Sequence, residues 1–411
     1  MTVPAAQEVA FLKGNEMAAV AARQVNFHIM GYYPITPSTE IAEELDEMLM
    51  ENLHQIRMIP AEGEHGAAGI CYGASTGGGR VINATSANGL LYMSEQVHWA
   101  AGARLPIVMC VVNRGIGAPW TIWNDHQDSI SQRDAGWIQL YACDHQQIID
   151  TVIQAFYLAE TVSIPVMVCY DGYLLSHTYM PFDIPEARAV DRFLPPFKPA
   201  YALDPRQPAN LNTVTLPDIR PDIRGDLAPG YAEIRHNLHF DLRQTIGTVA
   251  EIDAQFKEAF GRGGCPHVEL YCCDDADFIA VALGSLSYQL RDVVDMLREE
   301  GVRAGVCGIR LYRPFPDEAI VGALAKAKGV IVFEKALSYG NEGALCGDIK
   351  SALYRCDQRP FVRNYIVGLG GRDIRTADLL AAFRATCTTT EFKSDAPEWI
   401  GLKLQDNGRS L

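Results

Sequence analysis

The chain has 411 residues, 48% of them hydrophobic, and its 35 Lys and Arg against 50 Asp and Glu give a formal net charge of -15. This length and composition are typical of a globular protein of two or three domains. The acidic balance argues against nucleic acids and anionic membrane surfaces as partners. Because no signal-peptide pattern opens the sequence and no apolar run reaches membrane-spanning length, we expect a cytoplasmic protein.

Strands alternate with helices up to about residue 180. Helices are expected at residues 15–30, 41–50, 66–76, 90–101 and 147–160, and strands at 56–60, 81–85, 106–112, 138–142 and 165–170. The run from Pro106 to Val112 is uninterrupted and apolar, as in a parallel strand that is covered on both faces. The alternation therefore predicts an α/β domain with a doubly wound parallel sheet.

A proline-rich stretch of low periodicity separates this unit from a second α/β unit. A long helix is expected near residues 238–261, and further helices at 289–300, 316–327, 342–353 and 377–385. Strands are expected at 278–285, 304–311, 329–333 and 363–369. The expected domain organisation is an N-terminal domain at 1–192, a connector at 193–245, a second domain at 246–387 and a C-terminal arm at 388–411.

Eleven cysteines are scattered along the chain, and none forms a Cys-x-x-Cys pair. Several lie in apolar runs, such as Ile107–Cys110 and Val166–Cys169, where cysteine buries like a small hydrophobic residue. We therefore expect reduced core cysteines, and neither an iron–sulfur cluster nor a metal site in this chain.

The segment Ile59–Gly69 carries the sharpest chemical signal. Glu62 and Glu64 stand two residues apart among small and apolar residues, and the glycines let the backbone approach a ligand. A carboxylate in an apolar setting has a raised pKa and can exchange a proton with a heterocyclic nitrogen. The competing interpretation is a carboxylate held by backbone donors or an arginine. The spacing does not decide between Glu62 and Glu64, nor whether His65 assists.

Two further segments suit a small anionic substrate. Thr36 lies just before a predicted helix, where anions bind well, although an ordinary N-cap explains the sequence equally well. Arg114 follows a buried strand, at the end where open α/β sheets bind ligands, and a structural ion pair is its alternative role. The polar loop beyond it carries Asp125, His126 and Asp128, which suit a metal or a proton relay but are more often a hydrogen-bonded scaffold.

Several long motifs occur in one order: Gly31–Glu40, Glu62–His65, Ala84–Ser86, Asn113–Arg114, Ile122–Ser129, Asp171–Gly172 and Arg313–Pro316. Together they resemble the α subunit of 2-oxoacid:ferredoxin oxidoreductases, of which pyruvate:ferredoxin oxidoreductase is a member. The resemblance covers about residues 10–385. It implies a thiamine-diphosphate-binding-type domain followed by a transketolase C-terminal-like domain.

The resemblance also implies roles for individual residues. Glu64 would contact the aminopyrimidine ring of thiamine diphosphate and promote loss of the thiazolium proton. Thr36 and Arg114 would hold the 2-oxoacid. The remaining cofactor contacts implied are Pro34, Ile35 and Asn88. No Gly-Asp-Gly segment occurs, although a complete thiamine site needs one for magnesium and diphosphate, so the resemblance implies a β subunit that carries both.

The implied activity is oxidative decarboxylation of a 2-oxoacid to an acyl-CoA and carbon dioxide. Electrons would pass to iron–sulfur clusters on γ and ferredoxin-like δ subunits, and then to ferredoxin or an NAD-reducing subunit. The alternative is a non-catalytic scaffold subunit of such a complex. A stand-alone decarboxylase or transketolase conflicts with the missing diphosphate motif.

The substrate pocket departs from the pyruvate pattern. Gly115 and Gly117 stand where Ala and Ser are usual, and Asn88 replaces a usual Gln. Smaller side chains around a carboxylate anchor enlarge a pocket. We therefore expect a branched or aryl 2-oxoacid such as phenylglyoxylate, with pyruvate as the alternative; the acceptor and the subunit stoichiometry stay open.

Overall fold

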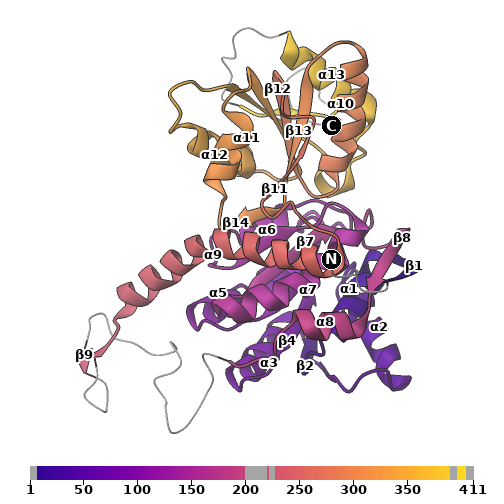
Figure 1. Cartoon of the computed structure of the whole chain (residues 1–411), viewed down its shortest axis with the longest axis vertical. Coiled ribbons are helices and arrows are strands. Elements are labelled where there is room, and N and C mark those ends of the chain that lie inside the picture. Colours follow the sequence, from indigo (N-terminus) through magenta and orange to yellow (C-terminus); the bar gives the residue numbers. More distant parts are fainter. Residues whose placement is uncertain (1–6, 200–219, 222–226, 389–395, 404–411) are drawn as a thin grey trace.

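The computed structural model describes residues 7–199, 220–221, 227–388 and 396–403. Two α/β units lie one above the other, with the N-terminal unit at the bottom of Figure 1 and the C-terminal unit at the top. Each unit is built on a mainly parallel sheet. The predicted fold class is therefore confirmed.

The N-terminal sheet has seven strands in the order β14-β6-β7-β5-β4-β2-β3. All its pairs are parallel except β14 with β6. The strands are β2 (Ile29–Tyr32), β3 (Arg57–Pro60), β4 (Val81–Thr85), β5 (Val108–Asn113), β6 (Ile138–Tyr141), β7 (Val166–Asp171) and β14 (Leu311–Arg313). Every residue of β4 to β7 is buried, as expected of parallel strands covered on both faces.

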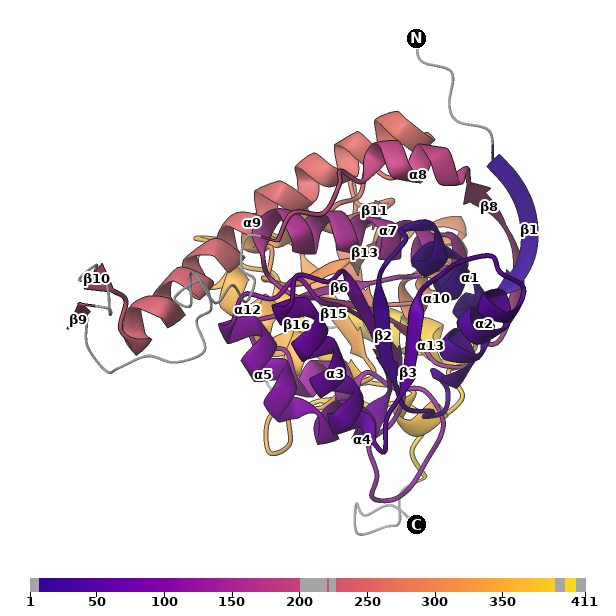
Figure 2. The same cartoon turned by 90° about the horizontal axis from the view of Figure 1, so that it is seen from below.

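Helices cover both faces of this sheet. They are α1 (Gly14–Gln24), α2 (Thr39–Met50), α3 (Glu64–Thr76), α4 (Ala87–Tyr92), α5 (Ser94–Gly102), α6 (Gln127–Ser131), α7 (His145–Val162) and α8 (Ala187–Phe193). In the view from below, α3 and α5 lie on one side of β2 and β3, and α1 and α2 lie on the other (Figure 2).

Several helix predictions were wrong in their extent, and the long helix expected near residues 238–261 spans Tyr231–Phe260. The helix expected at 15–30 ends at Gln24 because Asn26 has a φ of 51°, a left-handed conformation that stops a helix, and the following residues form β2. The helix expected at 90–101 is two helices, which meet at Met93. The antiparallel ribbon of β1 (Gln7–Lys13) with β8 (Tyr179–Pro185) was not predicted.

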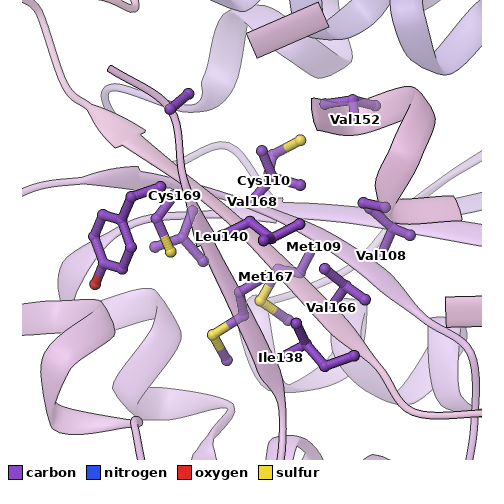
Figure 3. Close-up of a cluster of buried hydrophobic side chains, with 14 of the residues drawn as sticks. Val108, Met109, Cys110, Ile138, Leu140, Val152, Val166, Met167, Val168 and Cys169 are labelled. Carbon is purple, nitrogen blue, oxygen red and sulfur yellow. The ribbon is translucent and has the colours of Figure 1, made fainter. Parts of the chain in front are cut away.

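Part of the core of the N-terminal unit lies between its sheet and α7, and part lies under α3 and α5. Figure 3 shows apolar side chains of β5, β6 and β7 together with Val152 of α7, and Cys110 and Cys169 are among the members of this cluster. Burial raises the pKa of the Cys110 thiol to about 12, so this side chain behaves as a small hydrophobe. The expectation of core positions is confirmed for the cysteines that are buried: Cys71, Cys110, Cys143, Cys169, Cys307 and Cys346.

A long helix joins the two units. Helix α9 (Tyr231–Phe260) packs on α5, α7 and α8, and follows the short pair β9 (Arg220–Pro221) and β10 (Leu227–Ala228). The domain boundary expected between residues 245 and 246 falls inside this continuous helix. Much of the predicted connector, residues 200–219 and 222–226, lies outside the described residues.

The C-terminal sheet has six strands in the order β11-β13-β12-β15-β16-β17. They are β11 (Val268–Tyr271), β12 (Phe278–Leu283), β13 (Ala304–Ile309), β15 (Gly329–Glu334), β16 (Phe361–Ile366) and β17 (Glu398–Trp399). The helices are α10 (Leu286–Glu299), α11 (Asp317–Leu324), α12 (Ala344–Leu353) and α13 (Thr376–Cys387). Part of the predicted C-terminal arm, residues 389–395 and 404–411, lies outside the described residues.

The strand expected at residues 304–311 is interrupted at Arg310. This side chain is buried and donates to Asp253 at 3.3 Å and to Gln154 at 3.0 Å. Beyond it the chain enters the N-terminal sheet as β14, so the C-terminal unit supplies an edge strand to its neighbour.

Asp171, at the end of β7, is fully buried where the two units meet. Its Oδ1 lies 2.7 Å from His126 Nε2 and 3.2 Å from Lys335 Nζ, and its Oδ2 accepts from the Ser285 backbone N–H at 2.7 Å. Burial alone would raise the pKa of Asp171, but the charges of Lys335 and His126 hold it well below its usual range. Because Lys335 and Ser285 belong to the C-terminal unit, this carboxylate joins the two units.

Replacing Lys335 by Met removes the ammonium group that lies 3.2 Å from the buried Asp171 carboxylate. We expect the free energy of unfolding to fall by roughly 3 kcal/mol, measured by chemical denaturation. The double variant Lys335→Met, Asp171→Asn is expected to recover part of the loss, because no unpaired charge remains. Additive losses in the two single variants would contradict this coupling.

Candidate functional site

The site residues predicted from the sequence lie at the carboxyl end of the N-terminal sheet. Glu64 is the first residue of α3, where the positive end of the helix dipole favours a carboxylate. It packs against Gly89 of α4, because a Cβ on Gly89 would lie 2.8 Å from both Glu64 Cγ and Glu64 Oε1. The Glu64 side chain is therefore half-buried beside a glycine surface and does not extend freely into solvent.

The structure separates Glu64 from its two sequence neighbours. Glu62 is exposed, and its carboxylate lies over Gly66 on the side of α3, where a Cβ would be 2.5 Å from Oε1. His65 lies 3.5 Å from Glu95 Oε2. Only Glu64, of these three residues, packs against Gly89, so the geometry favours Glu64 where the spacing left the choice open.

Arg114 is buried directly after β5, with 5% of its surface exposed. Its Nη1 donates to the Thr36 carbonyl at 2.7 Å, and its backbone N–H donates to Asp128 Oδ2 at 3.0 Å. Its Nε is buried and has no hydrogen-bond partner among the described residues. Burial lowers the pKa of Arg114, and the nearby charges of Asp128 and Glu64 oppose that shift. A fixed guanidinium with an unused donor is suited to an anionic ligand.

Thr36 meets Arg114 through its backbone carbonyl, and its side chain is exposed. Ser38, which precedes α2, donates its hydroxyl to the Ile35 carbonyl at 2.9 Å and does not cap the helix. Ile35 is half-buried and Pro34 is exposed. The structure therefore places the predicted loop beside Arg114, and the N-cap interpretation of its hydroxyls is not supported.

The side chain of Asn88 forms hydrogen bonds to the loop that follows Arg114. Its Oδ1 accepts from the Gly117 N–H at 2.9 Å, and its Nδ2 donates to the Gly117 carbonyl at 3.3 Å. The side chain amide thus pairs with the backbone in both directions. Its direct role is to hold this loop.

Asp128 is the centre of the polar loop, and it is fully buried. It accepts from the backbone N–H groups of Ala87, Arg114 and Ser129 and from Asn113 Nδ2, at 2.7–3.0 Å. These donors confirm the prediction of a hydrogen-bonded scaffold. Within the part of the chain that the structure describes, no three or more His, Cys, Asp or Glu side chains are grouped so as to hold a metal ion.

Asp125 connects the same loop to the C-terminal unit. Its Oδ1 accepts from the Gln127 N–H and its Oδ2 from the Gly370 N–H, both at 3.0 Å. Burial, and then the charge of Asp128, raise the pKa of Asp125 to about 6. No local signal in the sequence indicates this contact, since Gly370 is 245 residues away.

The raised pKa of Asp125 predicts a pH-dependent stability. Ionisation costs more in the folded chain than in the unfolded one, so the stability due to this group is complete below the unfolded pKa and is lost as pH rises through about 6. Between pH 4 and 7 the unmodified chain should lose up to about 3 kcal/mol relative to Asp125→Asn, measured by urea denaturation at each pH. Parallel pH profiles of the two chains would contradict this assignment.

None of the helices in the described ranges is both long enough and apolar enough to cross a bilayer.

Two family profiles match the chain. Residues 20–238 match the family described as "Pyruvate flavodoxin/ferredoxin oxidoreductase, thiamine diP-bdg", and residues 276–379 match "Pyruvate:ferredoxin oxidoreductase core domain II". The first therefore contains Thr36, Glu64 and Arg114, and the chain carries a thiamine diphosphate-binding domain.

Two solved structures share this architecture. The 2-oxoglutarate:ferredoxin oxidoreductase from Magnetococcus marinus superposes with a TM-score of 0.66 at 20% identity, over 92% of this chain and 65% of that chain. A split-gene transketolase, an inactive β4 tetramer, superposes with a TM-score of 0.53 at 14% identity, over 92% of this chain and 98% of that one. At these identities the two structures show the fold alone.

Relatives in sequence identify the family. Ketoisovalerate oxidoreductase subunit VorA of Pyrococcus abyssi is 41% identical over 371 residues, 90% of this chain and 91% of that protein. Pyruvate synthase subunit PorA of Methanocaldococcus jannaschii is 39% identical over 401 residues, 96% of this chain and 98% of that protein. The chain therefore belongs to the family of 2-oxoacid:ferredoxin oxidoreductase α subunits.

Proposed function

We propose that the chain provides the pyrimidine side of a thiamine diphosphate site in a multi-subunit enzyme that converts a 2-oxoacid to an acyl-CoA and carbon dioxide. The observation that carries this proposal is the pairing of Glu64, held against Gly89, with the buried guanidinium of Arg114. A β subunit holds the diphosphate and magnesium, because this sequence has no Gly-Asp-Gly segment. The γ and δ subunits carry iron–sulfur clusters and pass electrons to ferredoxin or to an NAD-reducing subunit.

The residues beside Glu64 fit the cofactor. Gly89 lets Glu64 and Thr85 lie close to the backbone of α4, because a Cβ there would be 2.7 Å from Thr85 Oγ1 and 2.8 Å from Glu64 Oε1. Thr85 Oγ1 is buried without a hydrogen-bond partner among the described residues. Glu64 would hold a proton on its carboxyl group against a pyrimidine nitrogen, and the loop residues Pro34 and Ile35 would flank the ring. When bound, thiamine diphosphate supplies a nucleophilic carbon and an electron sink.

Arg114 would bind the carboxylate of the 2-oxoacid. Its backbone is fixed by Asp128 and one of its nitrogens by the Thr36 carbonyl, so the guanidinium is oriented before substrate arrives. The buried Nε lacks a partner among the described residues and is available to a substrate oxygen. The exposed hydroxyl of Thr36 provides a second contact, and Asn88 keeps the loop beyond Arg114 in place.

Replacing Glu64 by Gln tests this function in the assembled complex. The amide keeps the shape of the side chain but cannot exchange the proton, so we expect acyl-CoA formation to fall at least about 100-fold, with assembly and melting temperature retained. The matched control is Glu62→Gln, which changes an exposed carboxylate two residues away and should retain turnover. Unchanged turnover in Glu64→Gln would support the scaffold alternative.

The substrate class depends on the loop after Arg114. The prediction that Gly115 enlarges the pocket was wrong, because a Cβ there would lie 2.7 Å from Thr121 Cγ2 and 3.0 Å from Asp125 Oδ2 and would meet the protein's own packing. At Gly117 the nearest atom to a Cβ is Asn88 Oδ1 at 3.5 Å, so a side chain fits there and its absence leaves space. We infer a branched or aryl 2-oxoacid, with pyruvate as the alternative, and this inference now depends on Gly117.

Substrate competition on the complex measures this preference. We expect kcat/KM to be higher for 2-oxoisovalerate or phenylglyoxylate than for pyruvate, and Gly117→Ser to lower that ratio roughly tenfold by filling the space of a small group. Gly322→Ser, on exposed α11 with no atom within 4 Å of its Cβ, is the matched control. A strong preference of the unmodified complex for pyruvate would end the inference.

A further inference from the structure

A cavity of about 540 Å³ lies between the two units, outside the proposed active site. Trp123, Tyr173 and Leu174 line it from the N-terminal unit, and Ser285, Lys335 and Arg372 line it from the C-terminal unit. Thr36, Glu64 and Arg114 are not among its lining residues. The volume is within the range of small-molecule sites in proteins.

The cavity lies where the C-terminal sheet reverses its strand order. From β12 the chain first adds β13 on one side, and it later adds β15 on the other side. Ser285 follows β12 and Lys335 follows β15, so both lie at the carboxyl ends of the two strands that flank the switch point. Doubly wound α/β sheets bind their ligands in the crevice outside such a point.

One wall of the cavity is aromatic. The rings of Trp123 and Tyr173 are 4.8 Å apart at an interplanar angle of 48°. The backbone of Gly371 supports the indole from the other unit, since a Cβ on Gly371 would lie 2.4 Å from Trp123 Cβ. Trp123 nevertheless keeps 52% of its surface exposed, so a fixed aromatic surface is available to a flat ring.

The C-terminal unit adds positive charge to the cavity lining. Arg372 is exposed, and its guanidinium makes no hydrogen bond or ion pair with any residue that the structure describes. The buried Lys335 Nζ is committed to Asp171 and Asn124, so Arg372 is the cation available to a ligand. Asp373 is the acidic residue in the described lining. An aromatic surface and an unpaired guanidinium in the lining of one cavity suit a ligand that has both a flat ring and an anionic group.

We propose that this cavity binds an adenosine phosphate, with its base against the Trp123–Tyr173 pair and its phosphate on Arg372. A small 2-oxoacid would leave most of the volume empty and has no ring for the aromatic wall. The same chemical group occurs in a free adenine nucleotide and in coenzyme A, which are the two possible sources. The coenzyme A source rests on the proposed function, which forms an acyl-CoA, whereas the adenine nucleotide source goes beyond it. Binding is measured without turnover, so failure of this proposal is distinguishable from failure of the proposed function.

Calorimetric titration of the full-length chain with AMP, coenzyme A and inorganic phosphate tests the proposal without any catalytic readout. We expect AMP to bind at a single site, and Arg372→Gln to weaken that binding at least tenfold. Arg375→Gln is the matched control: this exposed arginine is paired with Asp378 at 2.8 Å, does not line the cavity and should leave binding unchanged. Trp123→Leu should also weaken AMP binding and should leave phosphate binding unchanged.

The outcomes separate the two sources. Binding of both AMP and coenzyme A that depends on Arg372 supports the shared adenosine phosphate group, and binding of coenzyme A alone supports coenzyme A as the source. Absence of binding of both compounds at millimolar concentration would overturn the proposal. Equal affinity of the unmodified chain and Arg372→Gln for AMP would also overturn it. Inorganic phosphate that binds as tightly as AMP would overturn it as well, because the aromatic wall would then contribute nothing to binding.

Discussion

The buried carboxylate of Asp171 organises the molecule around the proposed active site. It binds Lys335 and Ser285 of one unit, and His126 and Asn124 of the other. The loop that carries His126 also carries Asp128, whose carboxylate fixes the backbone of Arg114. The position of Arg114 therefore depends, through a continuous set of buried polar contacts, on the docking of the C-terminal unit.

Such a network is costly unless its members find partners, because a buried charge loses its hydration. Here Asp171 and Asp128 each accept several hydrogen bonds, and removal of one donor leaves a carboxylate that cannot be rehydrated. We infer that the network chiefly selects one relative position of the two units. Gly370 and Gly371 of the C-terminal unit also help to hold the two units in this arrangement. The Gly370 N–H donates to Asp125, and Gly371 packs against Trp123, both in the loop beyond Gly115.

Periodicity predicted the sheets well, and β4 was predicted at its observed bounds. The predicted bounds of a helix were wrong where Asn26 takes a left-handed backbone conformation. The predicted bounds of a strand were wrong where the strand is interrupted at the buried Arg310. The motifs singled out Glu64 and Arg114 as candidate site residues, but they did not predict the contacts of Lys335 and Gly370. Those contacts join positions more than 100 residues apart, and no local pattern of apolar and polar residues encodes them.

The edge strand β14 has a consequence for any attempt to divide the protein. Because residues 311–313 pair with β6, a polypeptide that stopped before them would leave the outer edge of its seven-stranded sheet unpaired. An open edge of this kind invites association with other chains. The two halves are thus not interchangeable modules, because a crossover between related genes ahead of Leu311 would take β14 from a different chain than the sheet it completes.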